Sequence, residues 1–138
     1  MWCKMKQEHI IQIQLIDQEA NQLSEQLKLI ELNVQEMNEL KLSLDEIDNL
    51  NDNDKKILTN LGRKIYLPVT INDNKLIVEV GKDNFVKKSI PETKKIINDQ
   101  IERLNDAKYQ IIEMLNNLQT KMDNLISEIE GEQNKSNK

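Results

Sequence analysis

The stretch that decides the fold is Lys64-Ile-Tyr-Leu-Pro-Val-Thr-Ile71, in which every second residue is aliphatic. Successive side chains of a strand point to opposite faces, so this alternation predicts a strand with one apolar face. That face carries Ile65, Leu67, Val69 and Ile71. Pro68 has no N–H to donate, which predicts that its strand lacks one ladder hydrogen bond or lies at an edge.

Further strand signals surround this stretch between residues 55 and 90. The turn cluster Asn72-Asp-Asn-Lys75 precedes the apolar run Leu76-Ile-Val-Glu-Val80, and we expect the strands on either side of the cluster to form a hairpin. A second turn, Gly81-Lys-Asp-Asn84, precedes Phe85-Val-Lys-Lys88, and an earlier strand, Lys56-Ile-Leu-Thr59, ends at Leu61-Gly62. The segment thus has room for four strands in two β-hairpins.

Outside this segment the apolar period changes from two to the 3-4 spacing of a coiled coil. Residues 1–61 and 92–130 contain neither Gly nor Pro, and nine of ten seam positions in each arm are apolar. The first seam carries Ile13, Ile16, Ala20, Leu23, Leu27, Ile30, Val34, Met37, Lys41 and Leu44, and the second carries Ile97, Ile101, Leu104, Lys108, Ile111, Leu115, Leu118, Met122, Leu125 and Ile129. We expect the exceptions, Lys41 and Lys108, to reach water or a facing carboxylate, or alternatively to fix the register.

The boundaries of the elements are signalled as well. Ser89-Ile-Pro-Glu92 is a capping sequence that predicts the start of the second helix, and Gly131 predicts its end. We therefore predict a mainly α chain with a small β insertion. It has coiled-coil helices over residues 1–54 and 91–131, two β-hairpins over 55–90, and a flexible tail over 132–138. The short connection folds the helices back antiparallel, which brings Ile47 near Ile97 and Ile13 near Ile129.

The composition excludes several classes of function. Three Gly and two Pro in 138 residues favour an extended helical molecule over a compact globule. Residues 1–54 hold 4 basic and 12 acidic side chains, and residues 55–95 hold 10 and 4, but aromatic residues for base stacking are missing apart from Tyr66 and Phe85. We expect no nucleic-acid partner. No stretch approaches the roughly 18 apolar residues that cross a bilayer, so we expect no membrane partner and a cytoplasmic location.

Catalytic constellations are not apparent in the sequence. A single His, His9, and a single Cys, Cys3, cannot form a zinc site of three or four His and Cys ligands. Gly62 and Gly81 are too far apart for a phosphate-binding loop, and the carboxylates are scattered over predicted helix surfaces. We therefore expect a protein that is not an enzyme and that uses no cofactor or metal.

The short strands predict a need for partner subunits. Strands of this length on two helices cannot bury both their apolar face and their open edges within one chain. We expect an oligomer interface on the hairpins, formed by Ile65, Leu67, Val69, Ile71, Leu76, Val78, Val80 and Phe85.

The hairpin motifs resemble those of the alpha-class subunit of prefoldin. That family marks its two hairpins by a small apolar strand followed by Leu-Gly, and by Val-x-Val-Gly with basic-Ser-Ile before the second helix. This sequence has Leu61-Gly62, Val78-Glu-Val-Gly81 and Lys88-Ser-Ile90 in those places, with Arg63 and Lys64 where the family often has small residues. The resemblance covers nearly the whole chain in architecture and residues 57–93 in specific motifs. Two hairpins, where the beta class has one, favour the alpha class.

The resemblance implies an ATP-independent molecular chaperone of the holdase type. It implies a hexamer of two alpha-class and four beta-class prefoldin subunits, with the hairpins joined into a double β-barrel body. It also implies that unfolded client proteins are held between the tips of the coiled-coil arms and passed to a group II chaperonin.

The arm tip carries more apolar residues than one two-helix seam can cover. Adaptable apolar groups near mobile chain ends suit the binding of many partners. We therefore expect client binding by Trp2, Met5, Ile10, Ile11, Ile13, Leu125, Ile126 and Ile129. The alternative for this end is a frayed seam with a dispensable Trp2. For the whole chain, two alternatives stay open: a structural coiled-coil scaffold or tether with one fixed partner, and a homomeric, filament-forming relative of prefoldin.

Overall fold

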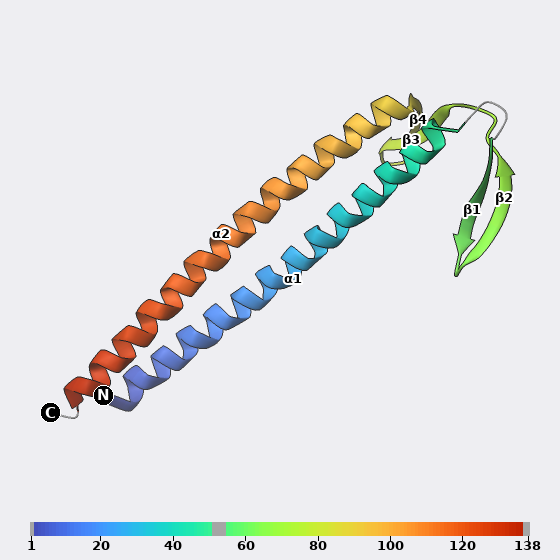
Figure 1. The fold of residues 1–138 in the computed structure, drawn as a ribbon. Coiled ribbons are helices and arrows are strands. Elements are labelled where there is room, and N and C mark those ends of the chain that lie inside the picture. The colour runs from blue at the N-terminus through green and yellow to red at the C-terminus, as the bar shows by residue number, and fades with distance from the viewer. Residues whose placement is uncertain (1, 51–54, 137–138) are drawn as a thin grey trace. The chain divides into compact units, whose positions relative to one another are not determined.

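The computed structural model describes residues 2–50 and 55–136, and the side chains of residues 7–50 and 55–132. Two long helices, α1 (Trp2–Asp48) and α2 (Ile90–Ser136), flank four strands in the sequence. The strands are β1 (Lys56–Gly62), β2 (Ile65–Thr70), β3 (Lys75–Gly81) and β4 (Asn84–Ser89). Figure 1 shows the strands as two separate hairpins. The prediction of a mainly α chain with a small β insertion of two hairpins is confirmed.

The chain divides into two units. Unit 1 consists of residues 1–34 and 103–138, and unit 2 of residues 35–102. The described part of unit 1 is entirely helical, whereas unit 2 contains the end of α1, both hairpins and the start of α2.

The helices of unit 1 run antiparallel, with the start of α1 and the end of α2 at the same end (Figure 1). His9 Nδ1 lies 3.8 Å from Glu132 Oε2, and Lys108 Nζ lies 3.6 Å from Glu31 Oε1. Every predicted seam position of α1 and α2 is buried or half-buried, as the 3-4 spacing requires. The expectation for Lys108 is confirmed, because its ammonium group faces the Glu31 carboxylate.

Truncation of Leu118 measures how much the seam contributes to the free energy of unfolding. Its side chain is only 6% exposed. Because truncation leaves a cavity in addition to lost apolar burial, we expect Leu118→Ala to destabilise unit 1 by about 2–3 kcal/mol. Leu29→Ala, at an exposed position of the same unit, should cost less than about 0.5 kcal/mol. Urea unfolding followed by the helical circular dichroism signal measures both, and equal losses would contradict the seam assignment.

Unit 2 has its own apolar core at the junction of helices and hairpin. Leu44 of α1 and Ile90 and Ile97 of α2 are buried together, and Leu76 of β3 packs against them. The start of α2 beside this core is capped: Ser89 Oγ accepts a hydrogen bond from the Glu92 N–H at 3.2 Å, as the capping sequence predicts. The hairpin formed by β3 and β4 is thereby anchored to the helices.

Lys94 links the helices of unit 2 on the surface. Its ammonium group pairs with the Asp45 carboxylate and lies 3.9 Å from Asp48 Oδ2. Both carboxylates are about half exposed, so this pair orients the helix ends more than it stabilises them.

The pairing of the strands differs from the sequence-based prediction. β1 pairs with β2, and β3 pairs with β4, both antiparallel. The strands on either side of Asn72-Asp-Asn-Lys75 belong to different sheets, so the hairpin predicted across that cluster is wrong. One tight turn lies instead at Arg63-Lys64, after Gly62, and the other lies at Lys82-Asp83, within the second predicted turn, Gly81-Lys-Asp-Asn84.

The two hairpin turns have the same length but different backbone angles. In each, the register shifts just before a Gly, and two residues close the loop. In the turn at Lys82-Asp83, only Asp83 lies in the left-handed region, with φ of 61°. Arg63 and Lys64 have φ of 51° and 65°, so both lie in the left-handed region, as in a type I′ turn. Asn60 supports this turn, because its Oδ1 accepts a hydrogen bond from the Gly62 N–H at 2.8 Å. The turn thus forms with two cationic residues where Asn-Gly is the usual choice.

The end of the second helix also differs from the prediction. α2 continues through Gly131 to Ser136, whereas the prediction ended this helix at residue 131. A Gly inside a helix costs about 1 kcal/mol relative to Ala, which neighbouring helix-forming residues tolerate. At the other end of the hairpin segment, α1 stops at Asp48, while the predicted helix extended to residue 54, and residues 51–54 lie outside the described chain.

Candidate functional site

The end of unit 1 where α1 starts and α2 ends carries a surface of exposed aliphatic side chains. Ile11 is 54% exposed and Leu15 is 59% exposed, and Ile10 and Ile126 are exposed as well. We call these four residues the tip patch. They lie off the seam of their helices, so the packing of α1 on α2 does not cover them.

The other predicted client-binding residues fall into two groups. Ile13 and Ile129 are half-buried seam residues, and Leu125 is only 7% exposed, so these three hold the helices together beneath the surface. The side chains of Trp2 and Met5 lie outside the described residues. The sequence analysis missed Leu15. Its position off the 3-4 spacing is the signal that could have identified it as an exposed aliphatic residue.

A groove adjoins the tip patch within unit 1. It has a volume of about 440 Å³ and lies between α1 and α2. Leu15, Ile16 and Leu125 form its apolar part, and its polar lining is formed by Gln12, Lys121, Asn124 and Glu128. A groove with aliphatic as well as polar lining suits the side chains of a bound polypeptide better than a small, wholly polar substrate.

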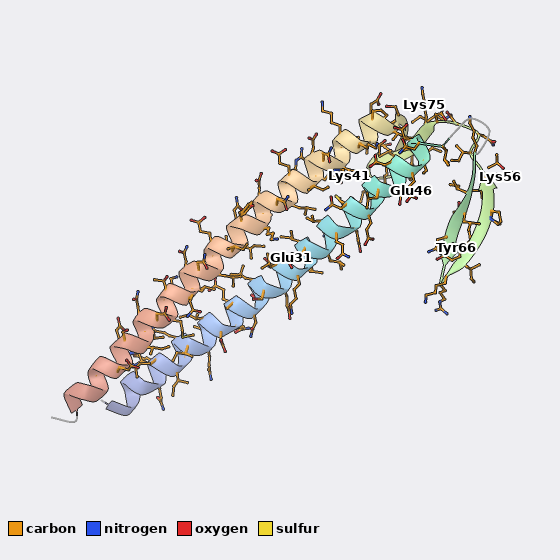
Figure 2. The ribbon with its side chains drawn as sticks, viewed as in Figure 1. Glu31, Lys41, Glu46, Lys56, Tyr66 and Lys75 are labelled. Atoms are coloured by element: carbon orange, nitrogen blue, oxygen red, sulfur yellow. The ribbon has the colours of Figure 1, made fainter. Side chains whose placement is uncertain are left out.

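The hairpin of β1 and β2 exposes apolar side chains on both faces. Cross-strand pairing of Thr59 with Leu67 and of Leu58 with Pro68 shows that Leu67 and Leu58 face opposite sides. Ile65 and Leu67 are exposed on one face, while Leu58 and Tyr66 are exposed on the other. Figure 2 shows Lys56 and Tyr66 towards opposite ends of this hairpin. A two-stranded sheet with two apolar faces is not stable alone in water, so it needs partners on both sides.

The hairpin of β3 and β4 is covered more completely. Leu76 and Val78 are half-buried on the face that contacts the helices. Phe85 pairs with Glu79, so it lies on the opposite face, and the predicted interface residues of this hairpin do not share one surface. Ile77, exposed by 71%, accompanies Phe85 and was missed by the sequence analysis. It lies inside a continuous apolar run, so alternation gave no signal for its face.

The segment between the hairpins holds a carboxylate with an altered pKa. The pKa of Asp73 lies below its ordinary value of 3.8, chiefly because the Lys75 N–H donates a hydrogen bond to Asp73 Oδ1 at 3.1 Å, and further because Lys87 is nearby. Lys87 Nζ lies 3.6 Å from Asp73 Oδ2. This carboxylate orders the start of β3.

The lowered pKa of Asp73 predicts that the folded chain loses a little stability in acid. Since its pKa is lower in the folded chain than in the unfolded chain, it contributes stability above pH 3.8, and this contribution is lost as the pH falls through the folded pKa. We expect Asp73→Asn to have a shallower fall in the free energy of unfolding between about pH 5 and pH 2. Denaturant unfolding of both proteins across that range measures it, and parallel curves would contradict it.

Metal-binding and membrane-spanning features are absent from the part of the chain that the structure describes. Among those residues, no group of three or more His, Cys, Asp and Glu is arranged to hold a metal ion. Neither described helix has a stretch that is long and apolar enough to cross a membrane.

Together, these features define a class of protein: a subunit with two coiled-coil helices, two open β-hairpins, and exposed apolar side chains where the first helix starts and the second ends. A family model described as a prefoldin subunit matches residues 16–135. The chain belongs to the prefoldin family.

Comparison with solved structures agrees with this assignment. The chain is similar to filamentous PFD from Methanocaldococcus jannaschii, determined by cryo-EM, with a TM-score of 0.74 and 18% sequence identity. The similarity covers 85% of this chain and 97% of that one, and at this identity it concerns the fold. A search of curated proteins returned no match. Family membership supports a chaperone-type role and assembly with other prefoldin subunits.

Proposed function

We propose that this chain is an alpha-class prefoldin subunit that acts as an ATP-independent holdase. The observation that carries the proposal is the tip patch, four exposed aliphatic side chains of which one, Leu15, also lines the groove of unit 1. Contiguous exposed apolar surface marks a binding site for other proteins, and aliphatic side chains accept many different partners. Unfolded polypeptides, which expose apolar side chains themselves, are the matching ligands.

The hairpins supply the assembly part of the proposal. Two apolar faces and two open edges on β1 and β2 support completion by other subunits. We propose a hexamer of two alpha-class and four beta-class subunits with a β-barrel body, in which client chains are held and then transferred to a group II chaperonin. A cytoplasmic location and the absence of enzymatic activity belong to the same proposal.

A homomeric filament is the second candidate. The similarity to a filamentous PFD is the observation that favours it. In that case the chain would assemble with copies of itself, and the hairpins would form the same kind of joint between identical subunits. Native mass spectrometry of the chain alone and with a beta-class partner distinguishes the two: a series of homo-oligomers supports the filament, and a discrete six-subunit complex supports the hexamer.

An aggregation assay tests the holdase role itself. The assembled protein, without ATP, should suppress the aggregation of several unrelated denatured proteins, measured by light scattering. Protection of diverse clients is the expected result. Protection of none would overturn the proposal in favour of a scaffold or tether with one fixed partner.

A further inference from the structure

The seam of unit 1 divides the tip patch. The 3-4 spacing extends to His9, four residues before Ile13, and to Glu132, three residues after Ile129. His9 Nδ1 lies 3.8 Å from Glu132 Oε2, so these two residues form the last described layer of the seam. Successive residues of an α-helix are rotated by about 100° around its axis. A residue directly before a seam position and one directly after it therefore lie on opposite sides of the helix pair.

The groove of unit 1 occupies one of these two sides. Apart from the seam residues Ile16 and Leu125, every residue that lines it directly precedes a seam position. These residues are Gln12 and Leu15 of α1 and Lys121, Asn124 and Glu128 of α2. The positions before the seam on both helices thus share one side, which we call the groove side. Leu15 is its exposed aliphatic residue.

The remaining side carries two other members of the tip patch. Ile10 directly follows His9 and Ile126 directly follows Leu125, so both lie away from the groove and neither lines it. Ile10 is 46% exposed and Ile126 is 43% exposed. We call this the open side. Ile11 follows Ile10 and faces outward between the two sides. The tip patch therefore consists of two aliphatic surfaces separated by the seam.

The open side is acidic. Among the described residues that directly follow a seam position in 7–24 and 116–132, the charged ones are Asp17, Asp123 and Glu130. All three are exposed. The groove side, in contrast, carries charges of both signs among its lining residues. A polypeptide segment that fits the open side should therefore combine aliphatic with basic side chains.

We propose that one unfolded polypeptide wraps around this end of unit 1 and binds both sides at once. A basic, aliphatic segment of the client lies on the open side, and a second aliphatic segment lies on the groove side. The inference rests on the proposed holdase role and divides its client site into two subsites.

The geometry of a helix sets the spacing of the two segments. Half the circumference of a helix about 10–12 Å across is roughly 16–19 Å, which about five or six extended residues span. Once one segment is bound, the second contact is intramolecular and adds to the affinity. A folded protein with one apolar patch gains only one of the two contacts, so this arrangement selects unfolded chains.

Tandem peptides test the inference. Each contains one segment of Leu and Lys and one segment of Leu and Ala, joined by a flexible Gly/Ser linker of either about two or about twelve residues. Fluorescence anisotropy with the full chain measures their affinities. The peptide with the longer linker should bind about tenfold or more tightly than the other, because it alone can span both sides.

Variants of each side assign this gain to the two subsites. Ile10→Ser with Ile126→Ser removes the open side, and Leu15→Glu places a carboxylate over the groove side. Each change should abolish the gain from the longer linker. Leu32→Ser with Met114→Ser alters two exposed apolar residues elsewhere in unit 1 and should retain the gain. A peptide that bridged two copies of the chain would keep its gain in both site variants, because every copy would retain one subsite.

Three outcomes would overturn the inference: equal affinity of the two peptides for the unaltered chain, no binding of either peptide, and a gain that survives in either site variant. The holdase proposal is judged separately by the aggregation assay. Protection of diverse clients together with equal peptide affinities would remove the two subsites and keep the holdase role. Linker-dependent binding without any protection would do the reverse.

Discussion

Ser in place of Ile10, Ile11, Leu15 and Ile126 should abolish suppression of client aggregation while assembly is retained. All four side chains are exposed and lie off the helix seam, so their replacement removes binding surface without opening the coiled coil. Covering one half-exposed aliphatic side chain is worth roughly 1 kcal/mol. Because about 1.4 kcal/mol corresponds to tenfold in affinity, loss of four should weaken client binding by about a hundredfold or more.

The control for this variant changes the same number of exposed apolar residues elsewhere in unit 1. Leu29, Leu32, Tyr109 and Met114 are about as exposed and lie away from the tip patch. Ser at these four positions has a similar cost in helix propensity and should leave client protection intact. Light scattering of a denatured client measures activity, and a sizing column verifies the assembly. If both variants protect equally, the tip patch is not the client site.

The second large effect is expected on the hairpin of β1 and β2. Asp in place of Ile65 and Leu67 should prevent assembly, because an unpaired carboxylate in a buried interface costs several kcal/mol. Both residues are exposed in the single chain, so the helices should fold as before. Native mass spectrometry should then show loss of the higher oligomers, and circular dichroism should show unchanged helix content.

Exposed polar positions of unit 1 provide the control. Asn33→Asp with Asn117→Asp adds the same two negative charges away from both hairpins. We expect assembly to persist in this control. Assembly of the Ile65 and Leu67 variant at the size of the unaltered protein would contradict the barrel-type interface.

Much of the fold follows from local patterns that the sequence displays. Every position that the 3-4 spacing identified, including the two lysines, is buried or half-buried, since burial along a helix depends on position relative to a single axis. The helix cap at Ser89 could also be predicted from the sequence, because its hydrogen bond joins residues only three apart. The need for partners followed from the length of the strands, and the hairpin motifs pointed to the prefoldin family.

The pairing of the strands was decided only by the tertiary structure. The strand around Ile65 and Leu67 can pair with either neighbour in sequence, and the alternation is the same in both cases. The choice of β1 depends on Arg63 and Lys64 adopting left-handed backbone angles, which side-chain type disfavours and the closed hairpin imposes. That choice in turn fixed which apolar residues are exposed.

Tertiary structure also decided which apolar residues of the candidate functional site are exposed. The sequence by itself determined that the arm end and the hairpins are rich in apolar residues, because composition and period are properties of the chain alone. Only the packing of α1 against α2 separated Ile11 and Leu15, which are exposed, from Leu125, which is buried. Only strand pairing placed Phe85 and Val78 on opposite faces. Exposure depends on which surfaces the neighbouring elements cover, and residues distant in sequence supply those surfaces.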